Sequence, residues 1–123
     1  PPRNTLVAYE KALVAAGSAI GLERRVPAPL KSIADQAIRS AASVPANLAE
    51  GHGRAGRDRI HHWRIAYASA IEVDCHLRLL MEADAIDRQQ ATSAIDLFDE
   101  VDVAPDAPPA ARAMTWRLLH PKP

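Results

Sequence analysis

Apolar residues recur at helical spacing in four stretches of this chain, and no stretch shows the strict alternation of apolar and polar residues typical of a half-buried β-strand. In the first stretch, Leu6, Tyr9, Leu13, Ala16 and Ile20 follow one another at intervals of three or four residues, which places them on one face of a helix. We therefore expect an all-α chain whose short connections join antiparallel neighbours in a four-helix bundle. The predicted helices cover residues 4–22, 31–50, 56–83 and 88–101, the last continued by 110–119, in one domain spanning 1–123.

The other three stretches supply the rest of the predicted core. Their apolar residues are Ile33, Ala37, Ile38, Ala41, Val44 and Leu48 on the second helix, Ile60, Trp63, Tyr67, Ala70, Val73, Leu77 and Leu80 on the third, and Ala91, Ile95, Leu97 and Phe98 on the fourth. At roughly 40 Å the third helix is longer than a compact domain of this size needs, so we expect it to have partners along its whole length.

Sequence signals for helix ends flank these stretches. Pro27 and Pro29 restrict the residues before them to extended backbone and are expected to end the first helix. Asp87 is the predicted N-cap of the fourth helix. The proline-rich segment 103–109 is expected to break that helix before its continuation at 110–119.

The second helix contains a proline of its own. Pro45 removes one i→i−4 hydrogen bond and its ring clashes with the carbonyl of Ala41. Because the apolar pattern continues to Leu48, we expect a kink here rather than a stop. Gly51 and Gly53 are expected to end the helix.

Charge is balanced overall but unevenly distributed. The 15 Lys and Arg residues equal the 15 Asp and Glu residues, so the net charge predicts no partner. Residues 1–81 hold eleven basic and seven acidic residues, residues 82–106 hold one and eight, and residues 107–123 add three basic residues. A chain divided in this way presents complementary faces to copies of itself, or a basic face to an anion.

The cysteine content and the apolar runs indicate the compartment. Cys75 is the single cysteine, so an internal disulfide is impossible and a reducing environment fits best. No apolar run approaches the roughly 20 residues that span a bilayer, and no secretory signal pattern is visible. We expect a cytoplasmic protein with no membrane partner. The chain begins Pro1-Pro2, as expected of a sequence that lacks its native start.

Two blocks of sequence resemble a known family. Residues 43–54 follow the pattern Ser-x-Pro-x-Asn-x-Ala-Glu-Gly-x-Gly-Arg, and Asp-Arg at 58–59 is followed by Arg-Ile-Ala-Tyr-Ala-Ser-Ala-Ile-Glu-Val at 64–73. Both blocks resemble the bacterial four-helix bundle family that includes proteins encoded within intervening sequences of 23S rRNA genes. That family is related to the accessory variability determinants of diversity-generating retroelements. Ala68 stands where the family usually has glycine, a departure expected to limit slightly the closest helix approach.

The resemblance implies a left-handed up-down-up-down bundle that assembles into a ring, usually a homopentamer. It implies no enzymatic activity, and the intervening-sequence members have no settled biochemical role. The retroelement relatives use a basic surface of the ring to bind nucleic acid and a reverse transcriptase. The residues that match the motif, for which we expect a structural role, are Ser43, Pro45, Asn47, Glu50, Gly51, Gly53 and Glu72.

The polar motif residues have two interpretations. Asn47 and Glu50 lie three residues apart on one helix face and would suit a recognition site. The favoured alternative is that Asn47 binds backbone groups freed at the kink, while Glu50 pairs with Arg54 or Arg39. We expect Glu72 to be buried among small residues, with a partner on the second helix or on a neighbouring subunit.

The densest basic cluster begins the third helix. Its members are Arg54, Arg57, Arg59 and Arg64, with His52, His61 and His62 nearby. These residues would suit a phosphate backbone, with Trp63 and Tyr67 near enough to stack on a base. The favoured alternative is that the arginines pair with the acidic region 82–106, within a subunit or across a ring contact. Both aromatic residues fit the core pattern better than a stacking role.

Metal and catalytic motifs are weak. Asp58 with His61 is a single copy of the spacing that carboxylate-bridged dimetal bundles repeat. Glu72 with His76 lacks the Glu-x-x-His spacing, and Cys75 points about 100° away from His76 on a helix. We therefore expect no cofactor and no enzymatic activity. The sequence favours a structural or interaction protein that forms a homo-oligomer, and the alternative is a nucleic-acid-binding accessory factor.

Overall fold

The computed structural model describes residues 3–101 as four long α-helices with no β-strand among them. The helices are α1 (Arg3–Glu23), α2 (Lys31–His52), α3 (Gly56–Glu82) and α4 (Arg88–Asp99), with a short 3-10 turn, η1 (Ala28–Leu30), before α2. The all-α prediction is therefore confirmed for this part of the chain. The predicted break at 103–109 and the continuation at 110–119 lie outside the described residues.

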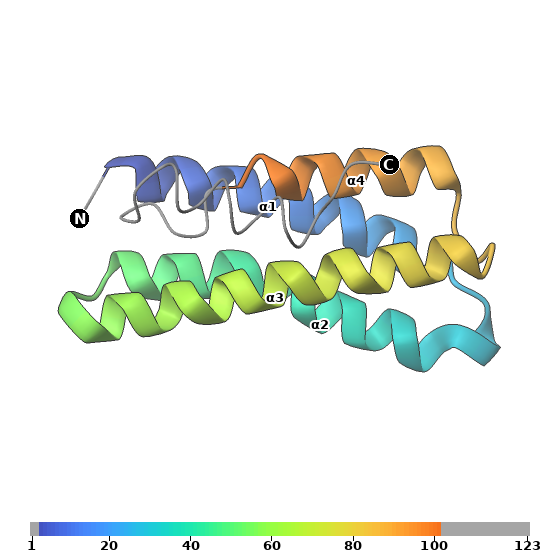
Figure 1. The fold of residues 1–123 in the computed structure, drawn as a ribbon, viewed down its shortest axis with the longest axis horizontal. Coiled ribbons are helices and arrows are strands. Elements are labelled where there is room, and N and C mark those ends of the chain that lie inside the picture. Colours follow the sequence, from blue (N-terminus) through green and yellow to red (C-terminus); the bar gives the residue numbers. More distant parts are fainter. Residues whose placement is uncertain (1–2, 102–123) are drawn as a thin grey trace.

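The four helices lie along one another (Figure 1). α1 and α3 each pack against both α2 and α4, so α1 and α3 lie on opposite corners of the bundle. The α1–α2 and α3–α4 connections lie at one end, and the α2–α3 connection lies at the other (Figure 1). This arrangement isolates the α2–α3 connection, where the basic cluster begins, at one tip of the molecule.

The predicted helix ends agree with local geometry. α1 ends before Pro27, and the Asp87 carboxylate accepts a hydrogen bond of 2.9 Å from the backbone N–H of Gln90, which makes Asp87 the N-cap of α4. Gly56 begins α3 with a φ of +60°, a left-handed conformation that glycine adopts without strain.

The buried face of α1 differs from the prediction. The residues that face the core are small: Ala8, Ala12, Ala15, Ala16 and Ala19. Leu6 and Leu13, which were expected in the core, are both 48% exposed, while Tyr9 and Ile20 pack at the edge of the core. The helical period was right and Ala16 is buried as expected, but the buried face turns away from both leucines, because alanines let α1 approach its neighbours more closely than leucines would.

A similar correction applies to Ile60, which begins the predicted core face of α3. Its side chain is 46% exposed, whereas Trp63, Val73, Leu77 and Leu80 are buried as expected. Ala68 is exposed too, so its methyl group does not limit helix approach within the subunit.

α2 continues through its proline, as predicted. Pro45 is buried inside the helix. Gly51, expected to help stop α2, is instead buried within the helix, and only Gly53 acts as the C-cap. Position 51 requires glycine because of tertiary packing, since a side chain there would collide with Trp63.

Candidate functional site at the α2–α3 junction

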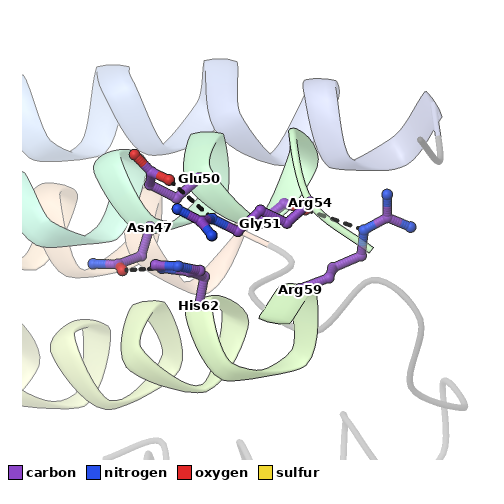
Figure 2. A network of polar contacts seen from close by, with 6 residues as sticks. All are labelled: Asn47, Glu50, Gly51, Arg54, Arg59 and His62. Carbon is purple, nitrogen blue, oxygen red and sulfur yellow. Dashed lines mark hydrogen bonds and ion pairs between the residues drawn. The ribbon is translucent and has the colours of Figure 1, made fainter. Parts of the chain in front are cut away.

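A chain of hydrogen bonds joins α2 to α3 through the family-like motif. Ser69 Oγ donates to Ser43 Oγ at 2.9 Å, and Asn47 Nδ2 donates to the same Ser43 hydroxyl at 3.0 Å. Asn47 Nδ2 also donates to the Ser43 carbonyl at 2.9 Å. Asn47 Oδ1 contacts His62 Nδ1 at 3.0 Å (Figure 2). Four side chains from two helices therefore form one connected network.

This network determines which nitrogen of His62 carries a proton. Because the Ser43 carbonyl can only accept, the Asn47 atom facing it must be the amide nitrogen. The Asn47 oxygen then faces His62, so His62 Nδ1 must donate. In the neutral imidazole, Nε2 is left as an acceptor.

Asn47 was predicted to bind backbone groups freed at the Pro45 kink, and it binds a different backbone group. Its amide binds a backbone carbonyl, as expected for a structural residue. That carbonyl belongs to Ser43, whereas the one that loses its helical donor at Pro45 belongs to Ala41. Asn47 therefore links the two helices and does not replace the bond lost at the proline.

Residues of α3 contact the C-terminal end of α2. Arg59 Nε donates to the Gly51 carbonyl at 3.1 Å (Figure 2), and the Arg59 guanidinium lies 5.7 Å from the centre of the Trp63 ring. Trp63 is 4% exposed, so its ring is not available to stack on a base. Arg59 thus satisfies one of the last carbonyls of α2.

The two motif glutamates have the predicted kinds of partner. Glu50 accepts from Arg54 Nε at 3.2 Å, one of the two arginines proposed for it (Figure 2). Glu72 accepts from Ser40 Oγ of α2 at 2.8 Å. The expected burial of Glu72 is wrong, because the residue is exposed. The partners Ser40 and Ser69 give no distinct signal in the sequence, because serine is common on helix surfaces.

The basic cluster is only partly neutralised. Arg57 and Arg64 are exposed and form no ion pair with other side chains among residues 6–101. In that part of the chain, the acidic region contributes one ion pair, Glu82 with Arg88 at 3.8 Å. Pairing of the arginines with the acidic region is therefore not seen within the described subunit. α3 also begins without a side-chain cap at Ala55.

Metal-ligating side chains do not converge in the described part of the molecule. Nowhere in residues 3–101 do three or more His, Cys, Asp or Glu side chains gather closely enough to hold a metal ion. None of the four helices in this range has the length and apolar character needed to cross a membrane.

Glu23 is an unusual residue that sequence analysis did not single out. It is 1% exposed, and neither carboxylate oxygen has a hydrogen-bond partner among the described residues. Burial raises the pKa of Glu23 to about 8, because a charged carboxylate loses its hydration in the core. Its position in phase with Ala12, Ala15 and Ala19 was the sequence signal that could have revealed its burial.

Comparison with known proteins points to one family. The family model of the 23S rRNA-intervening sequence proteins matches residues 4–104. A solved structure from Bacteroides thetaiotaomicron, described as a protein of unknown function from the S23 ribosomal protein family, is 28% identical. The match covers 80% of this chain and 90% of that one, with a TM-score of 0.72. No curated protein matches the chain.

Proposed function

This chain belongs to the family of 23S rRNA-intervening sequence proteins, and we propose that it is a cytoplasmic, non-enzymatic protein that assembles into a homo-oligomeric ring. The ring is a homopentamer that scaffolds or binds a macromolecular partner. Each subunit is a left-handed up-down-up-down bundle, and connections that alternate between the two ends support the up-down-up-down order (Figure 1).

The observation that carries this proposal is the outward face of α1. Leu6, Val7, Leu13 and Val14 are between 47% and 61% exposed. Together with Glu10, Gly17 and Gly21 they form what we call the α1 outer face. Large apolar side chains rarely cluster on the surface of a monomer, and such patches mark protein contacts.

The inward face of α1 makes the argument stronger. The helix places alanines toward its own core and its larger apolar side chains toward solvent. A helix adapted only to the monomer would bury the larger residues, because each fully buried leucine or valine side chain contributes about 1.5–3 kcal/mol. A second copy that covers the α1 outer face recovers this contribution.

Mass measurement tests the proposal directly. Light scattering of the purified protein at micromolar concentration should give five times the 13.3 kDa subunit mass. Val14→Asp should reduce the assembled fraction, whereas Ala42→Asp, at an exposed position on α2, should not. A monomer at this concentration would contradict the proposal.

A second candidate function is nucleic-acid binding at the tip of the bundle, favoured by exposed Arg57, which forms no ion pair within residues 6–101, beside the start of α3, which has no side-chain cap. Free N–H groups at a helix start and arginine side chains both attract phosphate. The titration of RNA or DNA binding against salt should then show affinity falling steeply as salt rises.

Two double variants, each of which removes two positive charges, test this second candidate. Arg57→Ala/Arg59→Ala should weaken binding and flatten the salt dependence, while Lys31→Ala/Arg39→Ala, at exposed positions on α2, should do neither. Circular dichroism checks that both variants remain folded. Equal binding by the two double variants would exclude the tip as the binding surface.

A further inference from the structure

Resting on the proposed assembly, we propose which surfaces form the contact between copies. The α1 outer face of one copy packs, in parallel, on the outward face of α3 in the next copy. The α3 outer face consists of Ile60, Arg64, Ala68, Cys75 and Leu79, all of them exposed. The contact is heterologous, since two different surfaces of the same chain meet.

The positions of the two helices in the bundle favour this type of contact. α1 and α3 lie diagonally across the bundle, so their outer faces point in different directions. Each face also holds large exposed apolar residues, such as Leu13 on α1 and Leu79 on α3. Two separate adhesive surfaces on one subunit generate a chain of head-to-tail contacts, which closes when the rotation allows it.

At one register, four positions of the α1 outer face align with four positions of the α3 outer face. Position 6 on α1 aligns with position 60 on α3, 10 with 64, 14 with 68, and 21 with 75. The paired positions have the same spacing on both helices, so each set lies along one face of its own helix. At this register Leu6 meets Ile60 of the next copy, and Val14 meets its Ala68.

Charge supports the same register. Glu10 lies between the apolar residues of the α1 outer face, and Arg64 lies between those of the α3 outer face. Both side chains are exposed, and neither forms an ion pair with another side chain in residues 6–101. The register brings each Glu10 opposite Arg64 of the neighbouring copy, where each neutralises the other.

Two glycines on α1 leave open space beside them in the described part of the subunit. A Cβ at Gly17 or Gly21 would meet nothing within 4 Å, yet glycine inside a helix lowers its stability. Glycine allows close approach of another backbone. On the α1 outer face, that backbone is the α3 helix of the next copy, which has the small residue Cys75 opposite Gly21 at this register.

Helix direction is consistent with a closed ring. α1 and α3 run in the same direction and begin near the same end of the bundle (Figure 1). Rotation about an axis parallel to the bundle keeps these directions, so α1 and the next copy's α3 are parallel without a shift along the axis. Heterologous contacts without such a shift close into a ring when the rotation between copies is a whole fraction of a turn, whereas a shift produces a filament.

A charge exchange tests the register in the full-length chain. Glu10→Arg and Arg64→Glu should each raise the dissociation constant of the assembly by about tenfold or more, because like charges then meet. The double variant Glu10→Arg/Arg64→Glu should return to within about threefold of the original protein. Lys11→Glu, exposed on α1 but off the outer face, is the control and should have little effect.

Disulfide formation tests the pairing of faces. In a Cys75→Ser background, Val14→Cys/Ala68→Cys should oxidise to a ladder of covalent oligomers, while either cysteine alone should give no crosslink. Dimers from Val14→Cys alone would show that α1 meets α1 and overturn the proposal. So would a charge exchange that fails to restore an otherwise oligomeric protein. A monomeric original protein would overturn the proposed ring itself. An oligomeric protein that fails the crosslinking or charge-exchange test would overturn only the pairing of faces, so the two failures are distinguishable.

Discussion

Gly51 of α2 lies directly against the indole of Trp63 in α3. A Cβ at position 51 would be 2.5 Å from Trp63 Nε1 and 2.6 Å from Trp63 Cδ1. Both residues are buried, and Arg59 holds the same region by donating to the Gly51 carbonyl at 3.1 Å. The absence of a side chain at position 51 is what allows α2 and α3 to meet at this tip of the bundle.

Replacing this glycine should be costly. Gly51→Ala must displace the Trp63 ring, and overpacking of this kind costs typically 1–3 kcal/mol of unfolding free energy. Urea unfolding followed by circular dichroism measures the loss. Gly53→Ala is the matched control, because its nearest neighbour would be 3.8 Å away. Equal effects of the two variants would mean that the indole contact is unimportant.

Glu23 should make the stability of the protein depend on pH. Its pKa is about 8 in the folded chain and 4.5 when the carboxyl is unperturbed, so between these values the folded state binds more protons than the unfolded state. The contribution of Glu23 to the free energy of unfolding should therefore be greatest below pH 4.5 and decrease as the pH rises to about 8.

The variant Glu23→Gln tests this effect, because glutamine has a similar shape and does not titrate. Unfolding free energies at pH 5, 7 and 9 should fall more steeply for the original protein than for the variant. The difference in slope isolates Glu23 from every other ionisable group. Parallel pH profiles would show that its carboxyl is not buried in solution.

The hydrogen-bond network predicts the tautomer of His62. Because Asn47 Oδ1 accepts from it, neutral His62 should carry its proton on Nδ1. Nitrogen chemical shifts from long-range proton–nitrogen NMR spectra distinguish this form from the Nε2–H form. His61, which is exposed, serves as the reference within the same spectrum. Observation of the Nε2–H form would contradict the orientation of Asn47.

Loss of Asn47 should weaken the α2–α3 contact. Asn47→Ala removes hydrogen bonds to Ser43 and His62, and leaving such part-buried groups without partners costs about 1–3 kcal/mol. Thermal unfolding measures the change. Ser93→Ala, at an exposed position where the hydroxyl contacts only the Gln89 carbonyl of its own helix, should stay within about 0.5 kcal/mol.

The N-cap of α4 provides a local test. Asp87→Ala removes the acceptor for the Gln90 N–H and should cost about 1 kcal/mol. Asp87→Asn keeps an acceptor and should retain most of the stability. A full loss in both variants would assign the effect to the charge of Asp87 near the helix start rather than to the hydrogen bond.

The sequence by itself determined the features that depend on neighbours along the chain. Helical period, the N-cap at Asp87 and the passage of α2 through Pro45 follow from interactions within a few residues. The same holds for Glu50 and Arg54, which lie one helical turn apart. These interactions form in any compact arrangement of the helices, so local patterns suffice to predict them.

Only the tertiary structure decided which face of α1 is buried and which side chains meet across helices. Helical spacing placed Leu6 and Leu13 in the predicted core, yet the bundle buries the alanines of α1, because the distance between helices depends on side chains of both partners. The burial of Glu23, the exposure of Glu72 and the contact of Gly51 with Trp63 have the same origin. Each depends on where a second helix lies, and a periodic pattern within one helix does not contain that information.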